Sequence, residues 1–198
     1  MSHEATPHTA AHSTAKNDGI LQITLNLAGA AFLSGLIIAA VYFITAPVAA
    51  EQRIVLRNNS MKELVPEASA FKPVEGKTGW FTAEKDGKTI AYLLPGEGKG
   101  YGGSIKMLVA ADATGAMVGY KVLSHNETPG LGDRTTQPKF RSQYTGKTVK
   151  EMFLTKDSPD GKIDAITGVT ISSRAITKAV RETLTALGEY NLLQGTAP

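Results

Sequence analysis

The longest apolar segment of the chain lies near its N-terminus. No charged residue occurs in residues 19–50, and this stretch is longer than the roughly twenty residues that a helix needs to cross the hydrocarbon core of a bilayer. A cleaved signal peptide is the alternative, because Val48-Ala49-Ala50 resembles a small-residue cleavage site. The apolar run is too long for the core of a signal peptide, so we predict an uncleaved transmembrane helix over residues 19–50.

Helical periodicity continues beyond this predicted span. Apolar residues recur at Ile54, Val55, Met61 and Leu64, which predicts a juxtamembrane helix over residues 51–66. This helix would hold the rest of the chain near the bilayer.

The middle of the chain has the pattern of β-hairpins. Short apolar segments flank turn residues at Asp86-Gly87 and again at residues 112–115, an arrangement typical of antiparallel strand pairs. The four strands are expected at residues 80–81, 90–94, 105–111 and 117–123.

Near the C-terminus the apolar residues return to helical spacing. They lie at Ile176, Ala179, Val180, Leu184 and Leu187. Antiparallel strands followed by a C-terminal helix predict an α+β domain. We expect this domain over residues 67–190, followed by a C-terminal tail over residues 191–198.

Composition narrows the chemistry that the chain can perform. The net charge of the 198 residues is +3, and no basic cluster with interleaved aromatic residues indicates a nucleic-acid partner. The chain has no cysteine, which excludes disulfides, thiolate catalysis, cysteine-ligated zinc and iron–sulfur clusters. If the protein transfers electrons, an organic cofactor must carry them.

The polar N-terminal segment contains three histidines but no close ligand spacing. His3, His8 and His12 are separated by Ala, Thr, Ser and Pro. This composition favours a disordered tail over residues 1–18 and not a metal site.

A hydroxyl-rich turn precedes the predicted C-terminal helix. Thr170, Ser172 and Ser173 follow Gly168, and Arg174 adds a positive charge. The first N–H groups of a helix have no intrahelical partner and attract anions. The alternative is an ordinary Ser/Thr helix cap.

Within this turn, Thr167-Gly168-Val169-Thr170 resembles the S/T-G-A-T flavinylation motif of the FMN-binding domain family. The membrane-bound members of that family are the G and D subunits of the Rnf complex and the B and C subunits of the sodium-pumping NADH:quinone reductase. In that family the last Thr carries FMN through a phosphoester bond, so the resemblance assigns the attachment to Thr170. It places Thr167, Gly168, Val169 and Ser173 around the cofactor, with Val169 replacing the usual Ala.

A second motif lies upstream and strengthens the resemblance. Residues 125–133, His-Asn-Glu-Thr-Pro-Gly-Leu-Gly-Asp, are similar to the H-x-E-T-P-G-L-G segment of the same family. That segment lines the flavin, which implies flavin contacts for Glu127, Thr128, Gly130 and Leu131.

The resemblance implies two further flavin contacts, Tyr101 and Lys156. The glycine-rich residues 98–103 are predicted to form a flexible loop, since they lack the G-K-S/T ending of a phosphate-binding loop. The family has a similar turn near its flavin, where Tyr101 would stack or shield. A family lysine near the position of Lys156 contacts the flavin, and a solvated surface lysine is the alternative.

The resemblance implies an electron-transfer flavoprotein subunit of an Rnf-type ferredoxin:NAD oxidoreductase that couples electron transfer to ion translocation. Its cofactor would be FMN, placed on Thr170 by a separate flavin transferase, and its partners would be membrane, flavin and iron–sulfur subunits. No residue is assigned a catalytic role. The alternatives are a C-type subunit of the sodium-pumping NADH:quinone reductase, a membrane-tethered flavin reductase, and a flavin-free structural subunit.

The expected topology depends on the resemblance and not on charge. Lys16 precedes the span, whereas Arg53, Arg57 and Lys62 follow it, so the positive-inside rule favours a cytoplasmic domain. The family has a single-pass anchor in the bacterial inner membrane, a cytoplasmic N-terminus and a periplasmic FMN domain. We follow the family, because large domains translocate largely regardless of flanking charge.

Overall fold

The structure is a computed structural model that describes residues 19–193. The expected N-terminal tail over residues 1–18, and residues 194–198 of the expected C-terminal tail, lie outside the described residues. The chain divides into two units, residues 1–51 and residues 52–198.

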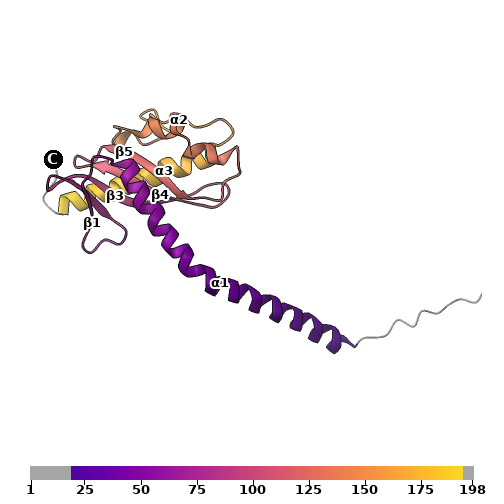
Figure 1. The fold of residues 1–198 in the computed structure, drawn as a ribbon. Coiled ribbons are helices and arrows are strands. Elements are labelled where there is room, and N and C mark those ends of the chain that lie inside the picture. Colours follow the sequence, from indigo (N-terminus) through magenta and orange to yellow (C-terminus); the bar gives the residue numbers. More distant parts are fainter. Residues whose placement is uncertain (1–18, 194–198) are drawn as a thin grey trace, which may run out of the picture. The chain divides into compact units, whose positions relative to one another are not determined.

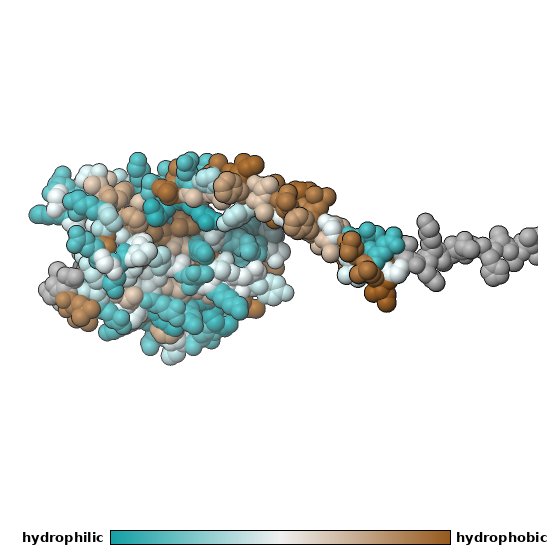
Figure 2. All heavy atoms as spheres, turned by 90° about the horizontal axis from the view of Figure 1, so that it is seen from below, coloured by the Kyte–Doolittle hydropathy of each residue, from teal (hydrophilic) through white to brown (hydrophobic). Residues whose placement is uncertain are grey.

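The described part of the first unit is helical. It belongs to α1 (Ile20–Leu64), a helix of 45 residues that continues through Pro47. By length and composition α1 can cross a membrane, and its most apolar window is fully exposed. Figure 2 shows hydrophobic residues gathered along it. The hydroxyls of Thr24, Ser34 and Thr45 each donate to a carbonyl four residues earlier in the helix, which satisfies them without water. A single helix therefore replaces the two consecutive segments expected from the sequence.

The second unit is built on a five-stranded antiparallel sheet in the order β1-β2-β3-β4-β5 (Figure 1). Its strands are β1 (Ala70–Pro73), β2 (Phe81–Lys85), β3 (Lys88–Lys99), β4 (Ser104–Asp112) and β5 (Met117–Ser124). Both predicted hairpins are confirmed. Asp86, at φ 52°, and Gly87 turn β2 into β3, while the Asp112 carboxylate accepts the N–H groups of Thr114 and Ala116 in the turn between β4 and β5.

The glycine-rich segment differs from the expected loop. β3 continues through Gly98 to Lys99, which pairs with Ser104, so the connection to β4 is a tight turn over residues 100–103. Gly98 is required by close packing, since a Cβ there would lie 2.6 Å from the backbone oxygen of Ala175. The absence of a side chain lets the C-terminal helix lie directly on β3.

Two apolar clusters cover opposite faces of the sheet. Alternate residues of β4 point to each side: Met107 and Val109 belong to the cluster under α3 (Thr170–Leu193), and Leu108 belongs to the other. The second cluster is closed by Met61, Leu64 and Val65 at the end of α1. The five apolar residues that predicted the C-terminal helix are all buried: Ile176, Ala179, Val180, Leu184 and Leu187.

Short helices connect β5 to α3: η1 (Gly132–Thr136), α2 (Pro138–Arg141), η2 (Ser142–Tyr144) and η3 (Val149–Glu151). Two buried tyrosines attach them to the rest of the domain. Tyr120 Oη donates to the Thr135 carbonyl at 2.8 Å, and Tyr144 Oη lies 2.7 Å from Thr177 Oγ1 of α3. The rings of Tyr120 and Tyr144 meet edge to face at 5.0 Å. These contacts fix the connection between β5 and α3 against the N-terminal half of α3.

Candidate functional site

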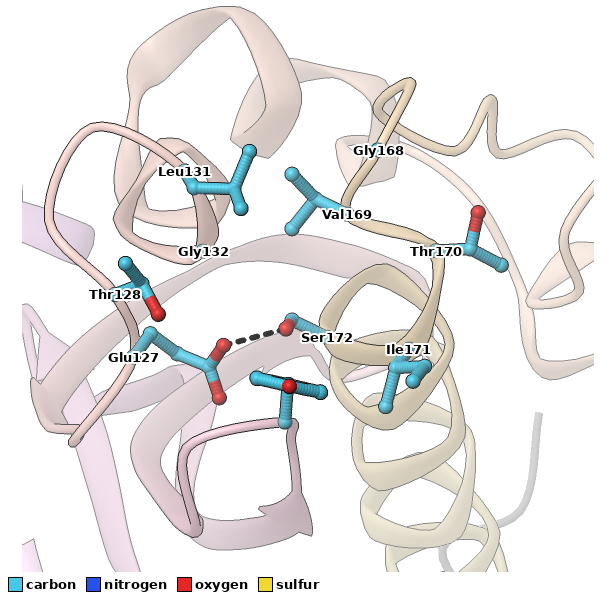
Figure 3. A pocket seen from close by; sticks show the side chains of 10 residues that line it. Glu127, Thr128, Leu131, Gly132, Gly168, Val169, Thr170, Ile171 and Ser172 are labelled. Atoms are coloured by element: carbon cyan, nitrogen blue, oxygen red, sulfur yellow. Dashed lines mark hydrogen bonds between the residues drawn. The ribbon is translucent and has the colours of Figure 1, made fainter.

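A cavity of about 280 Å³ lies where the segment after β5 meets the beginning of α3. It is lined by Tyr101, Glu127, Thr128, Leu131, Gly132, Gly168, Val169, Thr170, Ile171 and Ser172. These residues come from the glycine turn, from the residue 125–133 segment and from the hydroxyl-rich turn. Figure 3 shows the side chains of Leu131 and Val169 facing each other, with Glu127 and Ser172 joined below them.

Three large apolar side chains around this cavity remain open to solvent. Tyr101, Leu131 and Ile171 are 75, 45 and 52 % exposed. Beyond α1, the other exposed large apolar residues among those described are Leu192 and Leu193, at the end of α3. Apolar side chains left uncovered around one hollow are typical of a ligand site.

The residue 125–133 segment folds into a turn that presents its side chains to the cavity. The Thr128 carbonyl accepts the N–H groups of both Leu131 and Gly132, and the Glu127 N–H donates to His125 Nδ1 at 3.2 Å. Gly130, with φ of 73°, gives the turn its left-handed residue. Gly130 shapes the loop but does not line the cavity.

The buried Ser173 side chain stabilises the hydroxyl-rich turn through two hydrogen bonds. Ser173 Oγ donates to the Val169 carbonyl at 2.9 Å and accepts the Ile166 N–H at 3.2 Å. Gly168 has φ of 80°, and a Cβ there would lie 3.8 Å from the Leu131 side chain. The two segments singled out from the sequence therefore meet at Gly168 and Leu131.

Thr170 is the first helical residue of α3 and does not serve as its cap. The first helical hydrogen bond runs from the Ser173 N–H to the Val169 carbonyl, which places Val169 at the N-cap position. The Thr170 hydroxyl instead accepts a hydrogen bond from Lys156 Nζ at 2.6 Å. The side chain of Thr170 points away from the Glu127–Ser172 pair (Figure 3).

The positive charges near Thr170 have different partners. Arg174 is engaged by Asp157 through two bonds of 2.7 and 2.8 Å, and this guanidinium holds the pKa of Asp157 below its usual range. Lys156 is exposed and directed at Thr170. Lys156, and not Arg174, is thus the cation directed at the Thr170 hydroxyl.

Four candidate residues do not line this cavity: Gly130 and Lys156, described above, and Thr167 and Ser173. Thr167 lines a separate hollow of about 410 Å³ together with Arg134 and Gln143, and Ser173 is fully buried under the turn. Conversely, the lining includes Ile171, Ser172 and Gly132, which the sequence did not single out as contacts. Ser172 belonged to the recognised hydroxyl-rich turn, but its direction could not be deduced from spacing alone.

Comparison with known proteins gives this site a context. A family model described as the FMN-binding domain matches residues 100–185, a segment that contains every residue lining the cavity. The match identifies the part of the chain around the cavity as an FMN-binding domain.

Curated relatives extend the similarity over most of the chain. The G subunit of the proton-translocating ferredoxin:NAD(+) oxidoreductase complex of Clostridium ljungdahlii is 46 % identical over 166 residues, covering 83 % of this chain and 90 % of the relative. The G subunit of the ion-translocating oxidoreductase complex of Haemophilus influenzae (strain PittEE) is 32 % identical over 186 residues, covering 83 % and 88 %. The chain belongs to the FMN-binding domain family, among the G subunits of ion-translocating oxidoreductase complexes.

Solved structures show a more distant likeness. The C subunit of the Na(+)-translocating NADH-quinone reductase of Parabacteroides distasonis has 25 % sequence identity and a TM-score of 0.46, over 54 % of this chain and 58 % of that one.

Proposed function

We propose that this chain is a membrane-anchored electron-transfer subunit of an Rnf-type ferredoxin:NAD oxidoreductase complex, and that it carries FMN on Thr170 through a phosphoester bond. The observation that supports this most directly is the Thr170 hydroxyl at the edge of the apolar cavity. The helix does not use that hydroxyl as a cap, and Lys156 Nζ lies 2.6 Å from it.

The residues present fit FMN in shape and in charge. Leu131, Ile171 and Tyr101 would cover the flat ring system, and the Thr128 hydroxyl would meet its polar edge. Lys156 and the free N–H groups at the start of α3 would hold the linked phosphate. FMN supplies reversible electron transfer, which no side chain of this cysteine-free chain provides.

A separate flavin transferase is expected to make the bond. Within residues 19–193, the side chain that forms a hydrogen bond with the Thr170 hydroxyl is Lys156, and Lys156 donates that bond. It is therefore not arranged as a general base for the hydroxyl. The transferase would join Thr170 Oγ1 to the FMN phosphorus of FAD, break the pyrophosphate bond, release AMP and remove the hydroxyl proton.

Intact-mass measurement tests the assignment. Protein co-expressed with its transferase should gain about 440 Da, the mass of FMN less water, and Thr170→Ala should abolish the gain. Thr185→Ala is the matched control, because Thr185 is exposed on the same helix and bonds only to its own turn through the Arg181 carbonyl. Unmodified wild-type protein under these conditions would refute the proposal.

Reduction kinetics separate the alternatives. A carrier subunit should be reduced through its partner subunits and not by NADH alone, since the chain has no dinucleotide-binding fingerprint. Rapid anaerobic reduction of the purified subunit by NADH would instead favour a membrane-tethered flavin reductase.

We place the second unit on the periplasmic side of the bacterial inner membrane, with the N-terminus in the cytoplasm. The absence of cysteine allows a clean test. Ala113→Cys, in the exposed turn between β4 and β5, should react with a membrane-impermeant maleimide in intact spheroplasts. Ser13→Cys should react only after permeabilisation, and the reverse pattern would contradict this topology.

A further inference from the structure

The carboxylate of Glu127 is buried on the floor of the cavity. Its residue is 6 % exposed, and it is the only buried acidic or basic residue within residues 19–193. Glu127 is also the only charged side chain among the residues that line the cavity. The protein therefore places one isolated negative charge in a position where apolar groups dominate.

Both oxygens of this carboxylate receive hydrogen bonds. Ser172 Oγ donates to Oε2 at 2.6 Å, and the Gly102 N–H donates to Oε1 at 3.1 Å (Figure 3 shows the former). A hydroxyl and a backbone N–H directed at its two oxygens suit a group that only accepts hydrogen bonds, as an ionised carboxylate does. Without such partners, a buried charge would be costly.

Two glycines make room for the Glu127 side chain. A Cβ at Gly100 would collide with Oε1, and a Cβ at Gly132 would collide with Oε2. Neither glycine has a positive φ, so a side chain at either position would compete with the carboxylate for space and would not strain the backbone. The glycine turn, the residue 125–133 segment and α3 thus all accommodate this one group.

We propose that Glu127 lowers the one-electron reduction potential of FMN held in this cavity, and that Ser172 positions Glu127 for this role. The inference rests on the proposed function. Reduction adds negative charge to the ring, and a fixed negative charge in a poorly solvated cavity opposes that change. Lys156 acts from the opposite side, at the attachment point, where it is exposed and screened by solvent.

A bracing role between the loop and α3 is the competing explanation, and Glu127→Gln separates the two. The amide oxygen can still accept the Gly102 N–H, and the amide NH₂ can donate to the Ser172 hydroxyl. The substitution therefore preserves size and both contacts while it removes the charge. Glu127→Asp has the opposite effect, since it keeps the charge and shortens the reach to Ser172.

The experiment is a spectroelectrochemical titration of full-length, detergent-solubilised protein whose flavin content is first established by mass. E127Q should shift the one-electron equilibrium at least tenfold toward the reduced form, which is about 59 mV more positive. E127D should stay within threefold of wild type. Glu182→Gln, the same chemical change on the exposed face of α3, should leave the potential unchanged.

Each result has a defined meaning. The inference is overturned if the one-electron equilibrium constant of E127Q stays within threefold of wild type. It is also overturned if E127D shifts the equilibrium as far as E127Q does. If E127D loads flavin and E127Q does not, the charge serves loading and not tuning, and the inference also fails. Wild-type protein without flavin would instead defeat the proposed function itself. Ser172→Ala removes the α3 donor to the carboxylate and should reproduce part of the positive shift of E127Q. A lower urea midpoint with an unchanged potential would show that Ser172 only braces the loop and does not position Glu127.

Discussion

Lys156 Nζ lies 2.6 Å from Thr170 Oγ1, although the two residues belong to different segments of the domain. Lys156 follows Leu154, which forms an isolated bridge with Ile163, and Thr170 begins α3. The loop that carries Lys156 is held further by the ion pair between its Asp157 and Arg174 of α3. One exposed loop therefore contributes both a cation for Thr170 and an anchor to the same helix.

Removal of the lysine charge should slow attachment of FMN. Lys156→Met removes the exposed cation beside Thr170 Oγ1, and an exposed charge interaction contributes up to about 1 kcal/mol, which corresponds to roughly fivefold slower modification. Timed co-incubation with transferase and FAD, followed by intact mass, measures the rate. Lys156→Arg should retain most of it, and equal rates for the Met variant and wild type would exclude this role for Lys156.

The turn before α3 should depend on Ser173. Ser173→Ala leaves the Ile166 N–H without its partner in a partly buried position, and an unsatisfied buried donor costs about 1–3 kcal/mol. Urea denaturation should show a loss of this size in the free energy of unfolding, together with reduced flavin loading. Retention of full stability would mean that the turn does not need its buried hydroxyl.

Replacement by alanine should have opposite effects on stability at Gly98, in β3 beneath α3, and at Gly188, on the exposed face of α3. Gly98→Ala forces β3 away from the Ala175 carbonyl, and overpacking of this kind typically costs about 1–3 kcal/mol. Gly188→Ala adds a methyl group where nothing lies within 4 Å, and should stabilise the helix by about 0.5–1 kcal/mol. Thermal unfolding of both variants measures the contrast, and a tolerated Gly98→Ala would disprove tight packing of α3 on β3.

The ion pair that holds the Lys156 loop should weaken in acid. Arg174 lowers the pKa of Asp157 from its ordinary 3.8, so the pair contributes stability above that value and loses it as the pH falls through the lower folded-state pKa. Asp157→Asn should therefore be less stable than wild type at neutral pH, and the difference should shrink as the pH falls below 3.8 and vanish below the lower folded-state pKa. Urea midpoints at several pH values give the comparison, and a pH-independent difference would point to packing instead of charge.

The sequence predicted elements whose signals are local. The Asp86-Gly87 turn, the short apolar segment of β4 and the helical spacing in α3 are local signals, and all three agree with the structure. β1 (Ala70–Pro73) escaped notice because it is a four-residue edge strand with a terminal proline and no alternation. The length of β3 was underestimated because Gly98 is selected by contact with a helix almost eighty residues later.

The candidate site was predictable in part for the same reason. Both recognised segments contribute residues to the cavity lining. Each segment could be recognised because its motif is contained in a few consecutive residues. The bond between Glu127 and Ser172 joins positions 45 residues apart, and nothing in the local spacing of either segment indicates it. Thr167 and Ser173 are neighbours of Thr170 in sequence, but the turn directs them to a second hollow and to the interior.

Val169, and not Thr170, occupies the cap of α3, and this has a consequence for how the protein matures. The chain can complete its fold with the Thr170 hydroxyl still unmodified, because no backbone group of the helix depends on it. A modifying enzyme would then meet a finished, rigid acceptor and not an unfolded peptide. Cells that lack the enzyme should accumulate a stable, colourless precursor that remains competent for later activation.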